Sequence, residues 1–160
     1  MIRERNARTD DEEIIRLIKA ELMPLSWTTH QHDAKVIREL PLRLRRGVTY
    51  VAAAGKTAKP YGFIHFETAR DILMFSMLAV HPEHRNRHCG RKLMAAAEAY
   101  GLAASCTMAR LFVDQINGKA HHFYAKLGYQ TIRYYPELRC YEMIKGLLNT
   151  ENSSPMPLNT

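Results

Sequence analysis

The chain has 160 residues and a net charge of +7, with 46% hydrophobic and 24% charged residues. These proportions are ordinary for a globular protein, and the length predicts one domain with a core of its own. No apolar run reaches the about 18 residues of a membrane span, and the first residues lack the apolar segment of a signal peptide. The three cysteines are widely separated and form no C-x-x-C pair, which argues against a disulfide framework or a zinc site and favours the cytoplasm.

The positive charge fits either a nucleic acid or a polyanionic cofactor, and composition alone does not choose between them. The basic run at residues 43–47 is the candidate nucleic-acid patch. Because no aromatic residues interleave with it, we predict a solvated turn there instead. We therefore expect neither a nucleic acid nor a membrane as partner.

The first half of the chain predicts two helices after an initial strand at residues 2–7. Thr9 is the expected N-cap of the first helix, with Glu12 as its capping-box partner. Apolar residues at helical spacing follow, and Pro24 ends the helix. A second, short helix is expected over residues 27–40, where the proline that follows interrupts it.

Three strands come next. Residues 48–54 and 61–68 predict a hairpin around a Gly/Lys/Pro-containing turn. In its second strand, His65 and Glu67 share one face. Residues 72–80 are almost continuously apolar, which predicts a strand buried on both faces at the centre of the sheet.

The remaining elements alternate between helices and strands. Asn117 is the expected cap of the second helix in this part, and Gly128 its C-terminal glycine. The predicted elements are helix 90–107, strand 109–113, helix 118–127 and strands 129–135 and 139–144. The order β-α-α-β-β-β-α-β-α-β-β predicts an α/β (α+β) fold, in which a mixed sheet has helices on both faces. We expect a single domain at residues 1–148 and a flexible tail at 149–160, which is rich in Asn, Ser, Pro and Thr.

One stretch, residues 77–94, runs from a strand through a short basic loop into the start of a helix. That order gathers backbone N–H groups and positive charge around one point, which is typical of a phosphate or pyrophosphate site. Gly90 would let the backbone approach a bulky anion closely, and three arginines supply charge: Arg85, Arg87 and Arg91. His88 is expected to contribute its N–H and to have a negative φ. The alternative is a solvated basic turn before a surface helix.

The same loop resembles the acyl-CoA signature of the GCN5-related N-acetyltransferase (GNAT) family. The matching residues are Val80, Pro82, Arg85, Gly90 and Arg91, whereas Asn86 and His88 stand where glycines are usual. A second motif supports the resemblance: Asn117, Ala120, Phe123, Tyr124, Gly128 and Tyr129. The resemblance covers residues 2–147 and implies a sheet of about seven strands with a splayed central pair.

It also implies acetyl-CoA as the co-substrate, with no metal. The backbone of Leu78, Ala79 and Val80 would bind the pantetheine arm and the acetyl carbonyl, and the loop from Arg85 to Arg91 would bind the pyrophosphate. The loop residues in this prediction are Arg85, Asn86, Arg87, His88, Cys89, Gly90 and Arg91. Asn117 would contact the CoA arm, and Tyr124 would be the general acid that protonates the departing thiolate.

The general base is open. His65 and Glu67 share a strand face from which either side chain reaches an amine directly or through water, and Asp114 is a third candidate. Cys89 is an improbable nucleophile, although the start of a helix would make its thiol reactive.

The leading hypothesis is an N-acetyltransferase that moves the acetyl group directly to a primary amine in a ternary complex. The alternatives are a catalytically silent acyl-CoA-binding or sensing protein on the same fold and, more remotely, a nucleic-acid-binding domain. The acceptor amine belongs to a small molecule, a peptide or a protein, and a homodimer is compatible with the sequence.

Overall fold

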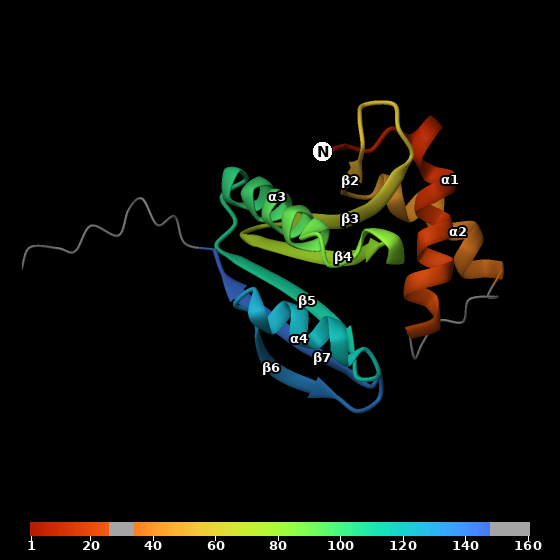
Figure 1. Ribbon diagram of the computed structural model, residues 1–160. Coiled ribbons are helices and arrows are strands. Elements are labelled where there is room, and N and C mark those ends of the chain that lie inside the picture. Colours follow the sequence, from red (N-terminus) through yellow and green to blue (C-terminus); the bar gives the residue numbers. More distant parts are fainter. Residues whose placement is uncertain (26–33, 148–160) are drawn as a thin grey trace, which may run out of the picture.

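The computed structural model describes residues 1–25 and 34–147, and these form one mixed sheet with helices on both faces (Figure 1). The strands are β1 (Ile2–Glu4), β2 (Val48–Ala53), β3 (Pro60–Ala69), β4 (Ile72–Val80), β5 (Met108–Asp114), β6 (Gln130–Tyr135) and β7 (Cys140–Gly146). The sheet order is β1-β2-β3-β4-β5-β7-β6, and only β4 and β5 pair in parallel. The mixed sheet and its central strand, β4, are confirmed.

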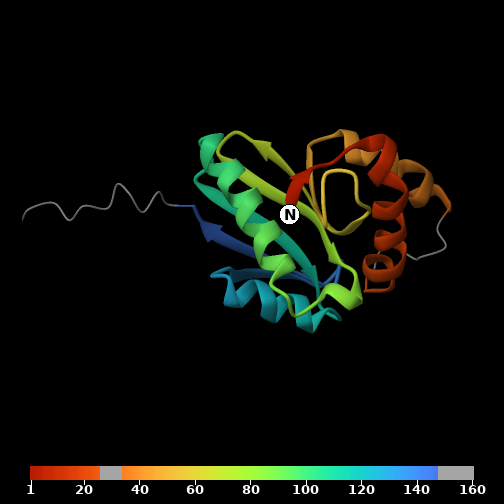
Figure 2. The same cartoon turned by 45° about the horizontal axis from the view of Figure 1, so that its top comes forward.

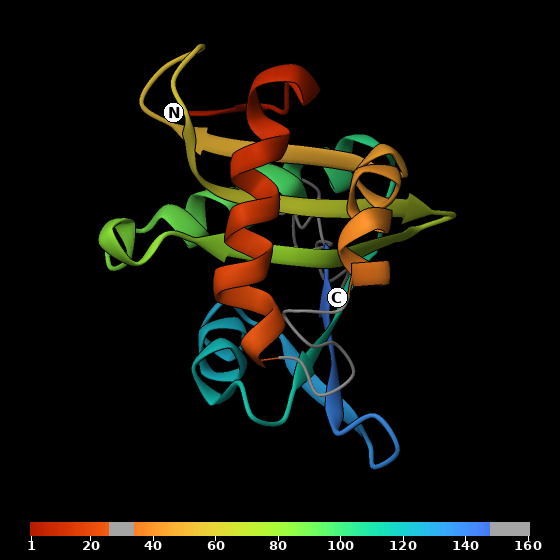
Figure 3. The same cartoon turned by 90° about the vertical axis from the view of Figure 1, so that its right-hand side faces the viewer.

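The helices divide between the two faces of the sheet. They are α1 (Ala7–Leu17), α2 (Ala34–Arg45), α3 (Cys89–Ala103) and α4 (Gly118–Lys126), with short turns η1 (Ile18–Leu22), η2 (Met23–Leu25) and η3 (Pro82–His84). Phe63 of β3 packs in the cluster formed by α1 and α2, whereas its neighbour Ile64 packs in the cluster formed by α3. Because successive strand residues point to opposite faces, α3 lies across the sheet from α1 and α2 (Figures 2 and 3).

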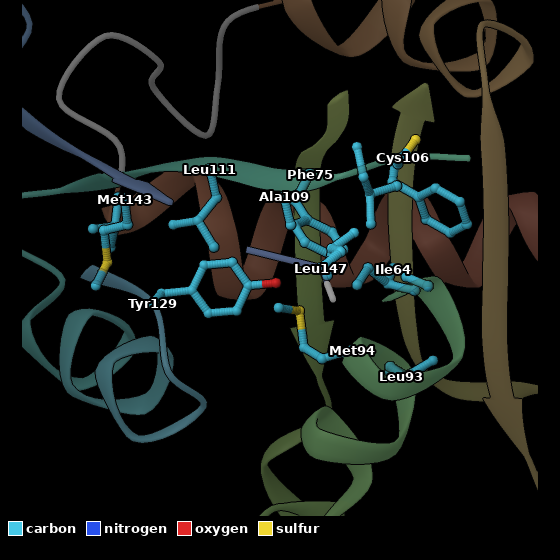
Figure 4. Packing of buried hydrophobic residues seen from close by; sticks show 14 of the residues in the cluster. Ile64, Phe75, Leu93, Met94, Cys106, Ala109, Leu111, Tyr129, Met143 and Leu147 are labelled. Atoms are coloured by element: carbon cyan, nitrogen blue, oxygen red, sulfur yellow. The ribbon is translucent and has the colours of Figure 1, made fainter. Parts of the chain in front are cut away.

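The larger core lies on the α3 and α4 side of the sheet (Figure 4). There Leu93 and Met94 of α3 meet Phe75 of β4 and Leu111 of β5, all of them at least nine-tenths buried. Tyr129, just after α4, inserts its ring into the same cluster and donates a hydrogen bond to the Glu98 carboxylate over 2.7 Å. This packing fixes the end of α4 against the sheet.

The parallel pair β4–β5 comes apart after three residue pairs. Pairing joins residues 72–74 to residues 108–110 and then stops, although both strands continue. Beyond this point the facing backbone edges of β4 and β5 are left without strand partners. The prediction of a splayed central pair is thereby confirmed.

Ser76 forms a bulge in β4 at the point where the strands separate. His65 of β3 pairs with Met77, and the next residue, Phe66, pairs with Phe75, so that Ser76 has no partner. Such a bulge bends a strand and redirects the residues that follow it. A serine within an otherwise apolar run was the sequence signal for this irregularity.

The first helix begins earlier than predicted. Asn6, not Thr9, is the N-cap, and its side-chain oxygen accepts a hydrogen bond from the Arg8 N–H over 3.1 Å. Asp10 completes the cap by accepting from the Asn6 N–H over 2.7 Å, and it also pairs with Arg3. An asparagine and an aspartate therefore share the role that the sequence pattern gave to Thr9 and Glu12.

The second helix extends further than predicted. The proline at position 41 lies inside α2, which continues to Arg45, so the expected solvated turn at residues 43–47 is in fact largely helical. Leu40 and Leu44 lie one turn apart and are 1% and 0% exposed. The proline removes one backbone hydrogen bond of the helix. Burial of Leu40 and Leu44 offsets this loss, so the helix continues past the proline. The predicted start of this helix, residues 27–33, lies outside the described residues.

Candidate active site

A cavity of about 370 Å³ opens where β4 and β5 separate. One wall consists of residues of these two strands and of α4 with its cap, and the other consists of residues of η1, η2 and α2. Its polar or charged lining residues, among the described parts of the chain, are Arg43, Ser76, Asp114, Asn117 and Tyr124. The other lining residues are apolar.

Tyr124 and Asn117 both face this cavity, as their predicted roles require. Asn117 also caps α4, because its side-chain oxygen accepts the Ala120 N–H over 3.2 Å. Within the described residues the Tyr124 hydroxyl has no hydrogen-bond partner. Burial of the phenol raises the pKa of Tyr124 to about 12, so the hydroxyl is protonated at neutral pH.

The backbone of β4 presents alternate residues to the gap. The His81 N–H donates to the Tyr61 carbonyl over 2.7 Å, which fixes the alternation of the antiparallel ladder between β3 and β4. By that alternation Ala79 exchanges hydrogen bonds with Phe63, whereas Leu78 and Val80 turn their N–H and C=O groups toward the gap. Leu78 and Val80 are therefore placed as predicted, but the backbone of Ala79 is occupied by β3.

The loop between β4 and α3 departs from prediction at the two positions where the family has glycine. Asn86 and His88 have φ values of 63° and 60°, both in the left-handed region. The negative φ expected for His88 is wrong. Asparagine and histidine are among the non-glycine residues that enter this region most readily, which explains how the loop keeps its shape without glycine.

This geometry predicts that glycine stabilises both positions. We expect Asn86→Gly and His88→Gly each to raise the free energy of unfolding by about 0.5–1 kcal/mol, since relief of the left-handed strain exceeds the added freedom of the unfolded chain. Denaturant unfolding without ligand measures the effect. Arg87→Gly is the matched control, because the intervening residue is not in the left-handed region, and it is expected to lower stability.

The arginines of the loop have separate environments. Arg85 forms an ion pair with Glu21 of η1 and donates from Nε to the Val80 carbonyl over 3.2 Å. The loop is thus tied to the helical segment that lines the cavity. Arg87 and Arg91 are exposed and form no ion pair with another described residue.

Gly90 and Cys89 have packing roles that were not foreseen. A Cβ on Gly90 would lie 3.2 Å from Cζ of Phe123, so the absence of a side chain allows α3 to pack against α4. Cys89 is buried, and this burial raises the pKa of its thiol despite the nearby charges of the amino terminus and Lys92. The expectation of a reactive thiol at the helix start is therefore wrong, because the side chain points into the core.

Neither His65 nor Glu67 lines the cavity. His65 is 2% exposed, its Nδ1 lies 2.8 Å from the Thr49 hydroxyl, and burial lowers its pKa. Glu67 is exposed near the far end of β3, opposite Met74. Although Met74 is the last residue of β4 that pairs with β5, the side chains of His65 and Glu67 do not reach the cavity.

Asp114 is the one carboxylate among the described lining residues. It ends β5, where its neighbour Val113 is buried in the core below α3 and α4. Alternation along the strand turns Asp114 to the opposite face, toward the wall formed by η1, η2 and α2. Arg43 and Glu21 were not foreseen as site residues, because each belongs to an element whose position over the sheet is set only by tertiary packing.

Metal-binding clusters and membrane-spanning helices are both absent from the described residues. No group of three or more histidine, cysteine, aspartate or glutamate side chains in these residues is arranged to hold a metal ion. Within the same ranges, no helix combines the length and apolar character that crossing a membrane requires.

The fold of this chain is similar to that of solved acetyltransferases. Ard1 from Thermoplasma volcanium is 25% identical, with a TM-score of 0.69 over 93% of this chain and 98% of that one. PaiA N-acetyltransferase from Thermoplasma acidophilum, solved with coenzyme A, is 18% identical, with a TM-score of 0.73 over 91% and 98%. A GNAT acetyltransferase from Staphylococcus aureus is 18% identical, with a TM-score of 0.72 over 92% and 99%.

Sequence comparison gives the family. Residues 45–131, more than half of the chain, match the acetyltransferase (GNAT) domain. The protein belongs to the GNAT family of acetyltransferases. No curated protein matches the sequence significantly.

Proposed function

We propose that this protein transfers an acetyl group from acetyl-CoA to a primary amine, directly and within a ternary complex. The observation that carries the proposal is the cavity between the separated strands, which Tyr124 and Asp114 both line. The acetyl-pantetheine arm lies along the free edge of β4. Leu78 and Val80 supply its backbone hydrogen bonds, and a backbone N–H directed at the acetyl carbonyl stabilises the oxyanion that forms on attack.

Tyr124 is the general acid in this proposal. When the tetrahedral intermediate collapses, the bond from carbon to sulfur breaks and the thiolate of CoA requires a proton. A phenol with a pKa raised by burial to about 12 holds its proton at neutral pH and has no competing hydrogen bond among the described residues. Asn117, which also lines the cavity, contacts the arm.

Asp114 is the general base, in place of His65 and Glu67. The attacking amine must be uncharged, and a carboxylate at the end of β5 accepts its proton directly or through one water. Asp114 and Val113 point to opposite faces of β5. Asp114 therefore lies on the face of the sheet that α1 and α2 cover, whereas Tyr124 of α4 reaches the cavity from the other face. The acceptor therefore enters past η1, η2 and α2, where Arg43 disfavours a polycation and the apolar walls favour an amine with an apolar substituent.

The proposal is tested by binding and turnover of the full chain. CoA at 100 times its dissociation constant is expected to stabilise the fold by about 2.7 kcal/mol, which appears as a higher melting temperature. A panel of primary amines with acetyl-CoA is then followed by release of free CoA thiol. Absence of any CoA effect on melting contradicts the cofactor assignment, whereas binding without turnover on every amine favours the silent acyl-CoA-binding protein.

A further inference from the structure

A second, smaller cavity lies beside the start of α3 and shares no lining residue with the first. Its volume is about 110 Å³. The lining residues come from the N-terminus, from β1, β2, β3, η3 and α3, and from the loop between η3 and α3: Met1, Ile2, Ala52, Tyr61, His84, Arg87, Cys89 and Lys92. We call it the Arg87–Lys92 cavity. It lies on the β1–β3 side of the loop, whereas the first cavity lies between β4 and β5.

The lining of this cavity is cationic and contains no carboxylate among the described residues. Arg87 and Lys92 are both exposed, and neither forms an ion pair with another described residue. Most surface cations near acids pair with them, as Arg85 does with Glu21. Two cations without ion-pair partners beside one cavity create a positive electrostatic potential there, and this potential attracts an anion.

His84 adds a polar group that lacks a partner. Its ring stacks on Tyr61 with centroids 4.1 Å apart and an angle of 6° between the planes, which fixes the imidazole in the cavity wall. Its Nδ1 is buried and has no hydrogen-bond partner among the described residues. A buried nitrogen of this kind costs free energy unless something outside the protein completes its hydrogen bond.

We propose that the Arg87–Lys92 cavity binds the 3′-phosphate of coenzyme A. This rests on the proposed function, which places CoA at the same loop. CoA has two anionic groups, the pyrophosphate and a phosphate monoester on the adenosine ribose. The pyrophosphate meets the backbone N–H groups at the start of α3. The 3′-phosphate, on the other side of the ribose that carries the pyrophosphate, meets the two cations on the far side of that turn. Arginine and lysine suit a phosphate monoester, because its oxygens accept several charge-assisted hydrogen bonds.

The test compares CoA with 3′-dephospho-CoA on the full chain by isothermal titration calorimetry. We expect the wild-type protein to bind CoA about tenfold to a hundredfold more tightly, the range for loss of one hydrogen bond to a charged group. In the double variant Arg87→Ala/Lys92→Ala, that preference disappears, because the affinity for CoA falls far more than the affinity for 3′-dephospho-CoA. Far-UV circular dichroism confirms that the variant is folded.

Arg91→Ala is the matched control, since it removes one exposed charge from the same turn without touching the cavity. It is expected to keep the wild-type preference for CoA. Equal wild-type affinity for the two compounds overturns the proposal, as does a double variant that loses affinity for both alike. If inorganic phosphate alone stabilises the wild type while CoA shows no preference, the cavity binds another phosphate and the assignment to CoA is overturned. Failure of both compounds to bind instead contradicts the proposed function itself.

Discussion

Tyr124→Phe is expected to lower kcat by about 10²–10⁴-fold, the contribution of a positioned general acid, and to leave the dissociation constant of CoA unchanged. The change removes only the hydroxyl. The half-buried ring still packs against Phe123 and Tyr129, whose ring centroids lie 5.3 Å and 6.1 Å away. Steady-state release of CoA thiol measures the rate, and calorimetric titration measures binding.

Tyr129→Phe is the matched control for this prediction. Tyr129 follows α4 closely, and the same substitution removes its hydrogen bond to Glu98, but its hydroxyl does not line the cavity. We expect lower stability with kcat within about twofold of wild type, because a lost hydrogen bond to a charged group costs about 1.5–3 kcal/mol of stability and no chemistry. Wild-type turnover in Tyr124→Phe would remove this residue as the acid and leave protonation of the thiolate to water.

Asp114→Asn is expected to lower kcat by about 10²–10⁴-fold for an amine that is protonated at the assay pH. The amide has nearly the same shape as the carboxylate but accepts no proton, so the amine must lose its proton to water before it attacks. Binding of CoA is expected to persist, because the residue lies on the opposite side of β5 from α4. Rates with a panel of amines of similar shape give the measurement.

The amine panel also distinguishes a base from a structural residue. An amine whose pKa lies below the assay pH is already uncharged and needs no base before attack. The deficit of Asp114→Asn is therefore expected to shrink for weakly basic amines. A deficit equal for all amines would mean that Asp114 holds the acceptor or the fold and is not the base. Glu67→Gln, an exposed carboxylate outside the cavity, is the matched control and is expected to retain wild-type rates.

Local sequence determined the elements and much of the cofactor half of the site. The apolar run of β4 specified a central strand, and Asn117 specified the start of α4, because both signals act between neighbouring residues. The basic loop and the second motif, ending at Gly128 and Tyr129, then pointed to the family without any knowledge of contacts. Where two local caps competed, as at Asn6 and Thr9, the choice depended on the ion pair between Asp10 and Arg3 of β1.

Tertiary structure alone decided which polar groups reach the cavity. The sequence favoured His65 and Glu67 over Asp114 as the base, but His65 is buried against Thr49, whereas Asp114 ends β5 beside the separated strands. The ion pair between Arg85 and Glu21 joins residues that are 64 positions apart, and no local sequence pattern predicts a contact between residues so far apart. The left-handed backbone of Asn86 and His88 could not be predicted from these residues alone either. The positions of β4 and α3, which the loop connects, impose this conformation. The sequence by itself therefore indicated the family and the basic loop, and only the packing of η1, α2 and β5 placed Arg43 and Asp114 at the cavity.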